Sequence, residues 1–213
     1  MWSFFRERWQ DIAFAAFQHT SLVVQSVALA TVIAIALALL VTTIRSLQPF
    51  ANAISAVGLT IPSFALLGLL LPLVGIGAVP SIIAVTFYAV LPILRNAIVG
   101  LESVNPSLLE SARGMGMNPF TSFLRVRLPM AWPIILTGLR VSTQMSMGVA
   151  AIAAFALGPG LGGYIFRGLA QTGTPAGLYY ALIGTIGVVL LAVVLDALLL
   201  LLGRVTISKG IRV

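Results

Sequence analysis

Residues 21–44 read SLVVQSVALATVIAIALALLVTTI, an apolar run of 24 residues that contains no Asp, Glu, Lys or Arg. A helix needs about 20 apolar residues to cross the hydrocarbon core of a bilayer. The run ends at Arg45, whose long side chain can reach the water at the membrane surface. This stretch predicts a membrane-spanning helix, because it is too long for the apolar part of a cleaved signal peptide.

Four more apolar segments of spanning length follow, over residues 53–74, 81–99, 134–157 and 178–203. The composition agrees, since 60% of the 213 residues are hydrophobic and 8% are charged, whereas soluble domains carry about 25% charged residues. The chain is thus predicted to be an all-α membrane protein with five spans, forming one domain over residues 1–213. This excludes an ordinary soluble enzyme, a disordered protein and a nucleic-acid-binding domain, although the net charge is +7.

Basic residues predict the orientation of the five spans, which place the two termini on opposite sides of the membrane. With the C-terminus in the cytoplasm, nine basic residues lie in or beside cytoplasmic segments and three lie outside, as the positive-inside rule requires. The nine are Arg45, Arg95, Arg113, Arg125, Arg127, Arg140, Arg204, Lys209 and Arg212, and the three are Arg6, Arg8 and Arg167. We therefore predict the N-terminus outside, with residues 2–17 as a short helix in the outer interface, because they mix aromatic and charged side chains.

The cytoplasmic loop over residues 100–133 differs from the rest of the chain because it contains two Asn-Pro pairs, Asn105-Pro106 and Asn118-Pro119. Asn is a favoured helix N-cap and Pro a favoured first helical residue, so each pair predicts the start of a short helix. Gly116 is expected to allow a sharp turn after the first helix, and Pro129 to close the second. The apolar faces of two such helices need cover from the protein's own bundle, the membrane surface or a cytosolic partner.

The same loop resembles the EAA loop found in permease subunits of binding-protein-dependent ABC importers. That pattern is Glu-Ala-Ala, three residues, Gly, nine residues, Ile, one residue and Leu-Pro. Here Glu110-Ser111-Ala112, Gly116, Val126 and Leu128-Pro129 stand at the same spacing, with Ser and Val replacing Ala and Ile. The match over 20 residues, inside the loop predicted to be cytoplasmic, identifies the chain as a member of this superfamily.

The resemblance implies the fold, the partners and the location of the protein. The fold would be that of the methionine-importer permeases (MetI-like), with cytoplasmic coupling helices that dock on the ATPase. The docking residues would be Glu110, Ser111, Ala112, Arg113, Gly116, Leu128 and Pro129. The partners would be a dimer of ATP-binding subunits, a second permease subunit (identical or paralogous), a substrate-binding protein and membrane lipid, in the bacterial cytoplasmic (inner) membrane. The local alternative is that Glu110 pairs with Arg113 along its own helix.

Other stretches resemble the osmoprotectant branch, whose substrates are glycine betaine, carnitine and choline. They are residues 61–68, 91–96, 112–117 and 138–140 together with the Gly-rich segment 158–163. This implies a betaine-type quaternary ammonium substrate. The alternative is a permease for methionine or another amino acid, and a secondary transporter is a remote alternative, because no acidic residue is expected at mid-membrane and no inverted repeat is visible.

No cofactor, metal or ATP site is predicted. The chain has no Cys and one His, His19, so neither thiol chemistry nor a cluster of metal ligands is expected. It also lacks the Gly-x-x-x-x-Gly-Lys-Ser/Thr motif of a phosphate-binding loop. We therefore expect a transport subunit rather than an enzyme, with ATP hydrolysis in a separate subunit.

The fourth predicted span carries the candidate pathway-lining residues. They are Ser142, Thr143, Gln144, Met145, Met147 and Phe155. Such polar groups either face a pathway or form hydrogen bonds between helices. Four aromatic residues, Phe64, Phe87, Tyr88 and Phe155, are candidates for soft contacts with a quaternary ammonium. Arg140 and Asp196 are expected near the cytoplasmic ends of their spans, where Asp196 would pair with Arg140 or Arg45.

Overall fold

The computed structural model describes residues 2–207 and 210, and the elements in this part of the chain are helices. Lys209 and Arg212, which enter the prediction of orientation, lie outside the described residues. Four helical segments are long and apolar enough to span a membrane. They are α1 (Trp2–Thr43), α4 (Ala78–Glu102), the segment Pro119–Ala156 that contains α7 (Leu128–Ala153), and α9 (Pro175–Thr206). With the bent pair of α2 (Gln48–Gly58) and α3 (Ser63–Val74) the count is five.

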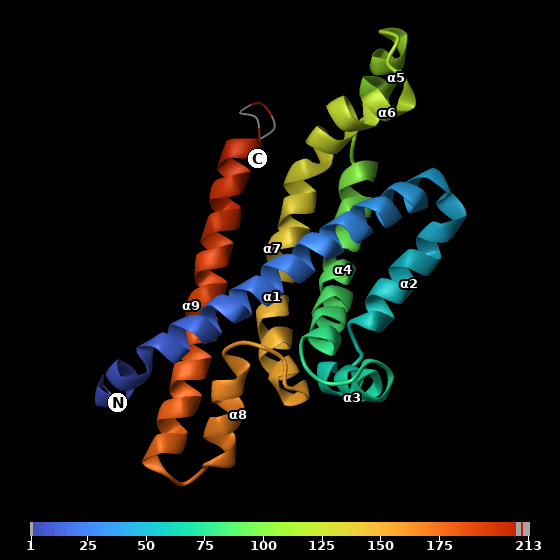
Figure 1. Ribbon diagram of the computed structural model, residues 1–213. Coiled ribbons are helices and arrows are strands. Elements are labelled where there is room, and N and C mark those ends of the chain that lie inside the picture. Colours follow the sequence, from blue (N-terminus) through green and yellow to red (C-terminus); the bar gives the residue numbers. More distant parts are fainter. Residues whose placement is uncertain (1, 208–209, 211–213) are drawn as a thin grey trace.

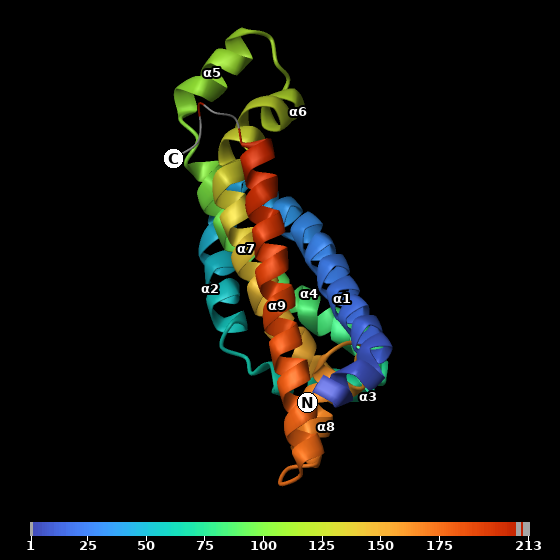
Figure 2. The same cartoon turned by 90° about the vertical axis from the view of Figure 1, so that its left-hand side faces the viewer.

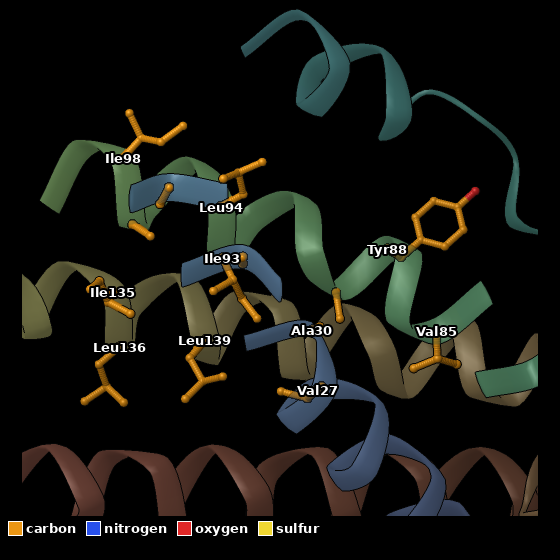
Figure 3. Packing of buried hydrophobic residues seen from close by; sticks show 14 of the residues in the cluster. Val27, Ala30, Val85, Tyr88, Ile93, Leu94, Ile98, Ile135, Leu136 and Leu139 are labelled. Atoms are coloured by element: carbon orange, nitrogen blue, oxygen red, sulfur yellow. The ribbon is translucent and has the colours of Figure 1, made fainter. Parts of the chain in front are cut away.

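The core of the subunit lies where α1 crosses α4 and α7, which run side by side (Figure 1). On α1, Ala30, Ala34 and Ala38 are fully buried at a spacing of four residues. Small residues at this spacing let helix backbones approach closely in a membrane, where packing rather than the hydrophobic effect joins helices. Figure 3 shows Val27 and Ala30 of α1 among the apolar side chains of α4 and α7.

The second predicted span, residues 53–74, is not a continuous helix. It is broken between α2 and α3, which meet at an angle of 97°. Pro62 follows the break in an extended conformation and precedes the first residue of α3. Proline lacks a backbone N–H and disfavours helix in the residue before it, so Pro62 ends the helical path although the whole segment is apolar.

The N-terminal segment 2–17 does not form a separate interfacial helix, because it is continuous with α1. Residues 2–43 contain neither Gly nor Pro, so nothing in the backbone chemistry interrupts this helix. Its first turns contact the start of α9, where the rings of Phe4 and Tyr180 lie edge to face with centroids 4.9 Å apart. The guanidinium of Arg8 lies 5.5 Å from the centre of the Tyr180 ring.

The two ends of the bundle differ (Figures 1 and 2). One end carries α5 (Pro106–Gly114), α6 (Pro119–Ser122) and the C-terminal end of α9, and the other carries the N-terminus, α3 and α8 (Gly162–Ala170). The start of α1 and the end of α9 therefore lie at opposite ends of the bundle.

Candidate coupling and translocation sites

Both Asn-Pro pairs begin helices, as predicted. The side-chain oxygen of Asn105 accepts a hydrogen bond from the backbone N–H of Ser107 at 3.0 Å, with α5 starting at Pro106. The side-chain oxygen of Asn118 accepts one from the N–H of Thr121 at 2.8 Å. Each cap satisfies a backbone donor that the first helical turn leaves without a partner, so local sequence alone fixes where these helices start.

Gly116 forms the turn between α5 and α6. Its φ angle is +80°, a left-handed conformation that glycine adopts without the penalty imposed by a Cβ atom. Its backbone N–H donates to the carbonyl of Arg113 at 2.9 Å. A Cβ atom at this position would meet nothing within 4 Å in the subunit, so glycine is required here by the turn and not by internal crowding.

The second coupling helix is not closed by Pro129, contrary to the sequence prediction. After α6 the chain makes a π-helical turn, η2 (Phe123–Arg127), and continues directly into α7. Pro129 lies in the first turn of α7, where its missing N–H breaks no helical hydrogen bond, and the N–H of Leu128 donates to the carbonyl of Phe123. We call α5, the Gly116 turn and α6 the coupling segment. As a result of the π-helical turn, this segment is joined to the fourth span, α7, by an unbroken helical path from α6 onward.

The motif residues divide into an internal and an external group. Ala112 is fully buried and Leu128 is half-buried, whereas Glu110, Ser111, Arg113, Gly116 and Pro129 are exposed. The Ser111 hydroxyl donates to the carbonyl of Ser107 at 2.8 Å. Glu110 and Arg113 do not form an ion pair with each other in the described structure, so both side chains are available to a partner.

An exposed apolar surface surrounds this turn, and we call it the apolar tip. It consists of Leu108, Met115, Phe120 and Leu124. Met115 and Phe120 are each 70% exposed, and Figure 2 shows α5 and α6 projecting beyond the ends of α7 and α9. Exposed apolar surfaces of this kind mark contact sites for other proteins or for membranes.

The candidate pathway residues on α7 fall on two sides of the helix. Ser142, Thr143 and Met147 are buried within the subunit, and the Ser142 hydroxyl donates to the carbonyl of Ala89 on α4 at 2.7 Å. Gln144 and Met145 are exposed. Packing between helices, the alternative to pathway lining, therefore applies to Ser142, Thr143 and Met147. Gln144 and Met145 instead lie where a solute could reach them.

Beyond its first turn, the exposed positions of α7 form a stripe along one side of the helix, which we call the α7 stripe. It consists of Thr137, Val141, Gln144, Met145 and Gly148. Their spacing of three and four residues puts them on one face, and Leu139 and Thr143, which lie toward α1, fall on another. Thr137 was not singled out from the sequence, although the spacing of seven residues to Gln144 would have placed it on the same face.

Asp196 pairs with Arg140 and not with Arg45, the other partner that the sequence analysis allowed. The Arg140 Nε–H donates to Oδ1 at 2.8 Å and its Nη2 to Oδ2 at 3.0 Å, so the pair is bidentate and joins α7 to α9. Near the ends of these helices, the Trp132 indole N–H donates to the Thr206 hydroxyl at 2.8 Å.

The ion pair lies within α7 and α9 rather than at the ends of these helices. At 1.5 Å per residue, it is roughly 12–15 Å from the level of the Trp132–Thr206 hydrogen bond.

Three aromatic side chains gather near the end of the bundle that carries the N-terminus, and we call them the outer aromatic cluster. Phe64 of α3 and Phe155, in the turn η3 (Ala154–Ala156), have ring centroids 4.2 Å apart, and Phe166 of α8 lies 6.2 Å from Phe155. Phe64 and Phe155 are each about half exposed.

Two other predicted aromatic contacts have a different role. The hydroxyl of Tyr88 donates to the carbonyl of Ile61, and its ring packs edge to face with Phe87. Tyr88 is buried, so this pair holds the break between α2 and α3 in place.

Among the described residues no three His, Asp or Glu side chains come together as metal ligands.

Comparisons with known proteins place the chain in a family. Residues 30–207 match the family described as "Binding-protein-dependent transport system inner membrane component". The chain is 37% identical over 205 residues to the choline transport system permease protein OpuBB of Bacillus subtilis, covering 95% of this chain and 91% of that protein. It is 39% identical over 206 residues to the osmoprotectant import permease protein OsmW of Salmonella typhimurium, covering 94% of each.

A third relative is the glycine betaine/carnitine/choline transport system permease protein OpuCB of Bacillus subtilis, which is 35% identical over 219 residues, covering 100% of this chain and 96% of that protein. Among solved structures, the fold is similar to a chain of the inward-facing MetNI methionine ABC transporter, with a TM-score of 0.73, 24% identity and coverage of 95% and 96%. That likeness confirms the predicted MetI-like fold. The chain therefore belongs to the family of binding-protein-dependent transport system inner membrane components, as a multi-pass ABC permease subunit.

Proposed function

We propose that this permease subunit serves an ATP-driven importer that carries betaine-type quaternary ammonium osmoprotectants delivered by a binding protein. The observation that carries the proposal is the coupling segment, whose exposed motif residues and apolar tip are joined without interruption to the fourth span. The relatives named above transport choline, glycine betaine or carnitine, or import osmoprotectants, according to their names. These names favour a quaternary ammonium over methionine.

The partners of the chain follow from what it lacks. It has no phosphate-binding loop, so ATP hydrolysis belongs to a dimer of separate subunits. Five spans are few for an alternating-access pathway, so we assign the pathway to the contact between two permease subunits, identical or paralogous. Membership of the importer family argues against the secondary-transporter alternative.

The docking surface for the ATP-binding subunit comprises the exposed motif residues and the apolar tip. Glu110 and Arg113 supply charges that orient the contact, and Met115 and Phe120 supply apolar area. Ala112 supports this surface from inside. Closure of the ATP-binding dimer would move α5 and α6, and the unbroken helix through η2 would transmit that movement to α7.

Among the predicted pathway residues, we assign lining roles to Gln144, Met145 and Phe155. Their exposure lets them meet a solute between two subunits. The outer aromatic cluster presents ring faces to which a quaternary ammonium is attracted, with a strength of about 0.5–1 kcal/mol at exposed sites. This weak attraction suits a translocation pathway, since tight binding would retain the substrate.

An uptake assay tests the proposed function. The permease would be reconstituted in liposomes with its ATP-binding subunits and binding protein, and uptake of labelled glycine betaine, choline and methionine would be measured with ATP or a non-hydrolysable analogue inside. We expect uptake of a quaternary ammonium that requires ATP hydrolysis. Uptake of methionine alone would make the substrate assignment wrong, and uptake without ATP hydrolysis would make the importer assignment wrong.

The absence of Cys from the chain allows a direct test of orientation. Thr172 and Ser107 are exposed at opposite ends of the bundle. In spheroplasts, a membrane-impermeant maleimide is expected to label Thr172→Cys and to label Ser107→Cys only after permeabilisation. The reverse pattern would show that the N-terminus is cytoplasmic. The unaltered protein is the control, because it offers no thiol.

A further inference from the structure

The Arg140–Asp196 pair is not sealed inside the subunit. The side chains are 31% and 20% exposed, and Arg140 lies on α7 beside the α7 stripe, one helical turn from Gln144. The amide of Gln144 approaches the carboxylate of Asp196. A buried structural pair would have both charges covered, so the exposure of this one requires an explanation.

The surroundings of the pair indicate that this surface does not face lipid. Charged side chains within membrane-spanning helices are costly and commonly face a cavity or another protein chain. Along α9, most of the exposed large side chains are aliphatic. They include Ile186, Val189, Leu190, Val193, Val194 and Leu198. The α7 stripe differs, because it combines Thr137, Gln144 and Gly148 with the apolar Val141 and Met145, so polar groups lie next to the pair.

Arg140 keeps unused hydrogen-bonding capacity on this face. A guanidinium has five N–H donors in a planar fork, and the pairing with Asp196 engages Nε and Nη2. Within the part of the chain that the structure describes, Nη1 has no acceptor. A carboxylate could therefore bind the free edge of Arg140 without displacing Asp196, which holds the guanidinium in a fixed orientation.

We propose that Arg140 and Asp196 form a recognition site for zwitterionic substrates within the pathway. This inference rests on the proposed function. The carboxylate of a betaine binds the free edge of Arg140, and its quaternary ammonium lies toward the negative charge of Asp196. The two fixed charges thus form a dipole that is antiparallel to that of the substrate. Choline carries a hydroxyl in place of the carboxylate, so it gains only the attraction to Asp196.

A purely structural role is the competing explanation, because the pair also ties α9 to α7. The two roles differ in what happens when both charges are replaced by apolar side chains. Such replacements for membrane or buried ion pairs often preserve packing. The double variant Arg140→Met/Asp196→Leu should therefore keep α9 packed against α7, but it cannot recognise a carboxylate.

The experiment measures substrate binding to the purified complex of permease and ATP-binding subunits without binding protein, by saturation-transfer NMR with glycine betaine and choline in turn. In Arg140→Gln we expect the affinity for glycine betaine to fall about tenfold or more, the size of one charge-assisted hydrogen bond, with the affinity for choline unchanged or raised. The double variant should lose the same preference for glycine betaine while assembling as the wild type does.

Three results would overturn the proposal. They are equal losses for both ligands in Arg140→Gln, recovery of the preference in the double variant, and no binding of glycine betaine by the wild type. None of these results contradicts the proposed function, which is decided separately by ATP-dependent uptake with the binding protein present. Conversely, a wild type that binds glycine betaine at Arg140 but shows no ATP-dependent uptake would refute the importer and leave the recognition site standing.

Discussion

Replacing Met115 and Phe120 together by Asp is expected to abolish ATP-driven uptake while leaving the permease folded in the membrane. Both side chains are 70% exposed at the apolar tip, so the fold of the subunit does not depend on them. In the complex they would enter the docking surface of the ATP-binding subunit. Two carboxylates buried there without partners cost several kcal/mol, enough to lower the affinity by about a thousandfold or more.

The measurements are co-purification of the ATP-binding subunits and uptake in reconstituted liposomes. Met115→Leu/Phe120→Leu is the matched control, because it changes the same positions and keeps their apolar character. We expect the control to retain both properties and the Asp variant to lose both. If the Asp variant binds the ATP-binding subunits and transports as the wild type does, the apolar tip is not the docking surface.

Replacing Gly138 is expected to destabilise the fold, because α7 packs tightly against α4 at this residue. A Cβ atom there would lie 2.6 Å from the Cβ of Asn96 and 3.0 Å from the carbonyl oxygen of Pro92. Neither atom is at the end of a flexible side chain, so the two helices must separate. Gly138→Ala should destabilise the subunit by about 1–3 kcal/mol, as overpacked cores do, and Gly138→Leu should prevent stable folding.

Gly148, on the same helix, provides the control. A Cβ atom at Gly148 would meet nothing within 4 Å, so Gly148→Ala should stabilise the helix by about 0.5–1 kcal/mol. Thermal unfolding of the detergent-purified protein measures both changes. A lower Tm for Gly138→Ala with an equal or higher Tm for Gly148→Ala is expected. Equal effects at the two positions would show that the close approach of α4 and α7 is not what Gly138 provides.

Features governed by neighbours in the sequence were predicted well. The caps at Asn105 and Asn118 depend on hydrogen bonds spanning two or three residues, and the structure confirms both. The apolar segments predicted α1, α4, α7 and α9 because spanning length and hydropathy are properties of a single stretch of chain. The motif spacing within the coupling loop likewise led to the family that the comparisons show.

Two errors arose where one residue type has two opposite consequences. Proline breaks a helix from within but is tolerated in its first turn. Pro62 lies inside an apolar segment and breaks it, whereas Pro129 lies at a helix start and does not end anything. Hydropathy averaged along a segment cannot distinguish these cases, because it carries no information on hydrogen-bond register.

By itself, the sequence determined that this chain is a helical membrane protein with five predicted spans and a loop that matches the motif of ABC importer permeases, because apolar length, motif spacing and helix caps are local properties. Only the tertiary structure decided that Ser142 points into the subunit while Gln144 points out, and that Asp196 pairs with Arg140. The helical period defines which residues share a face, but which face is covered depends on helices that are distant in the sequence.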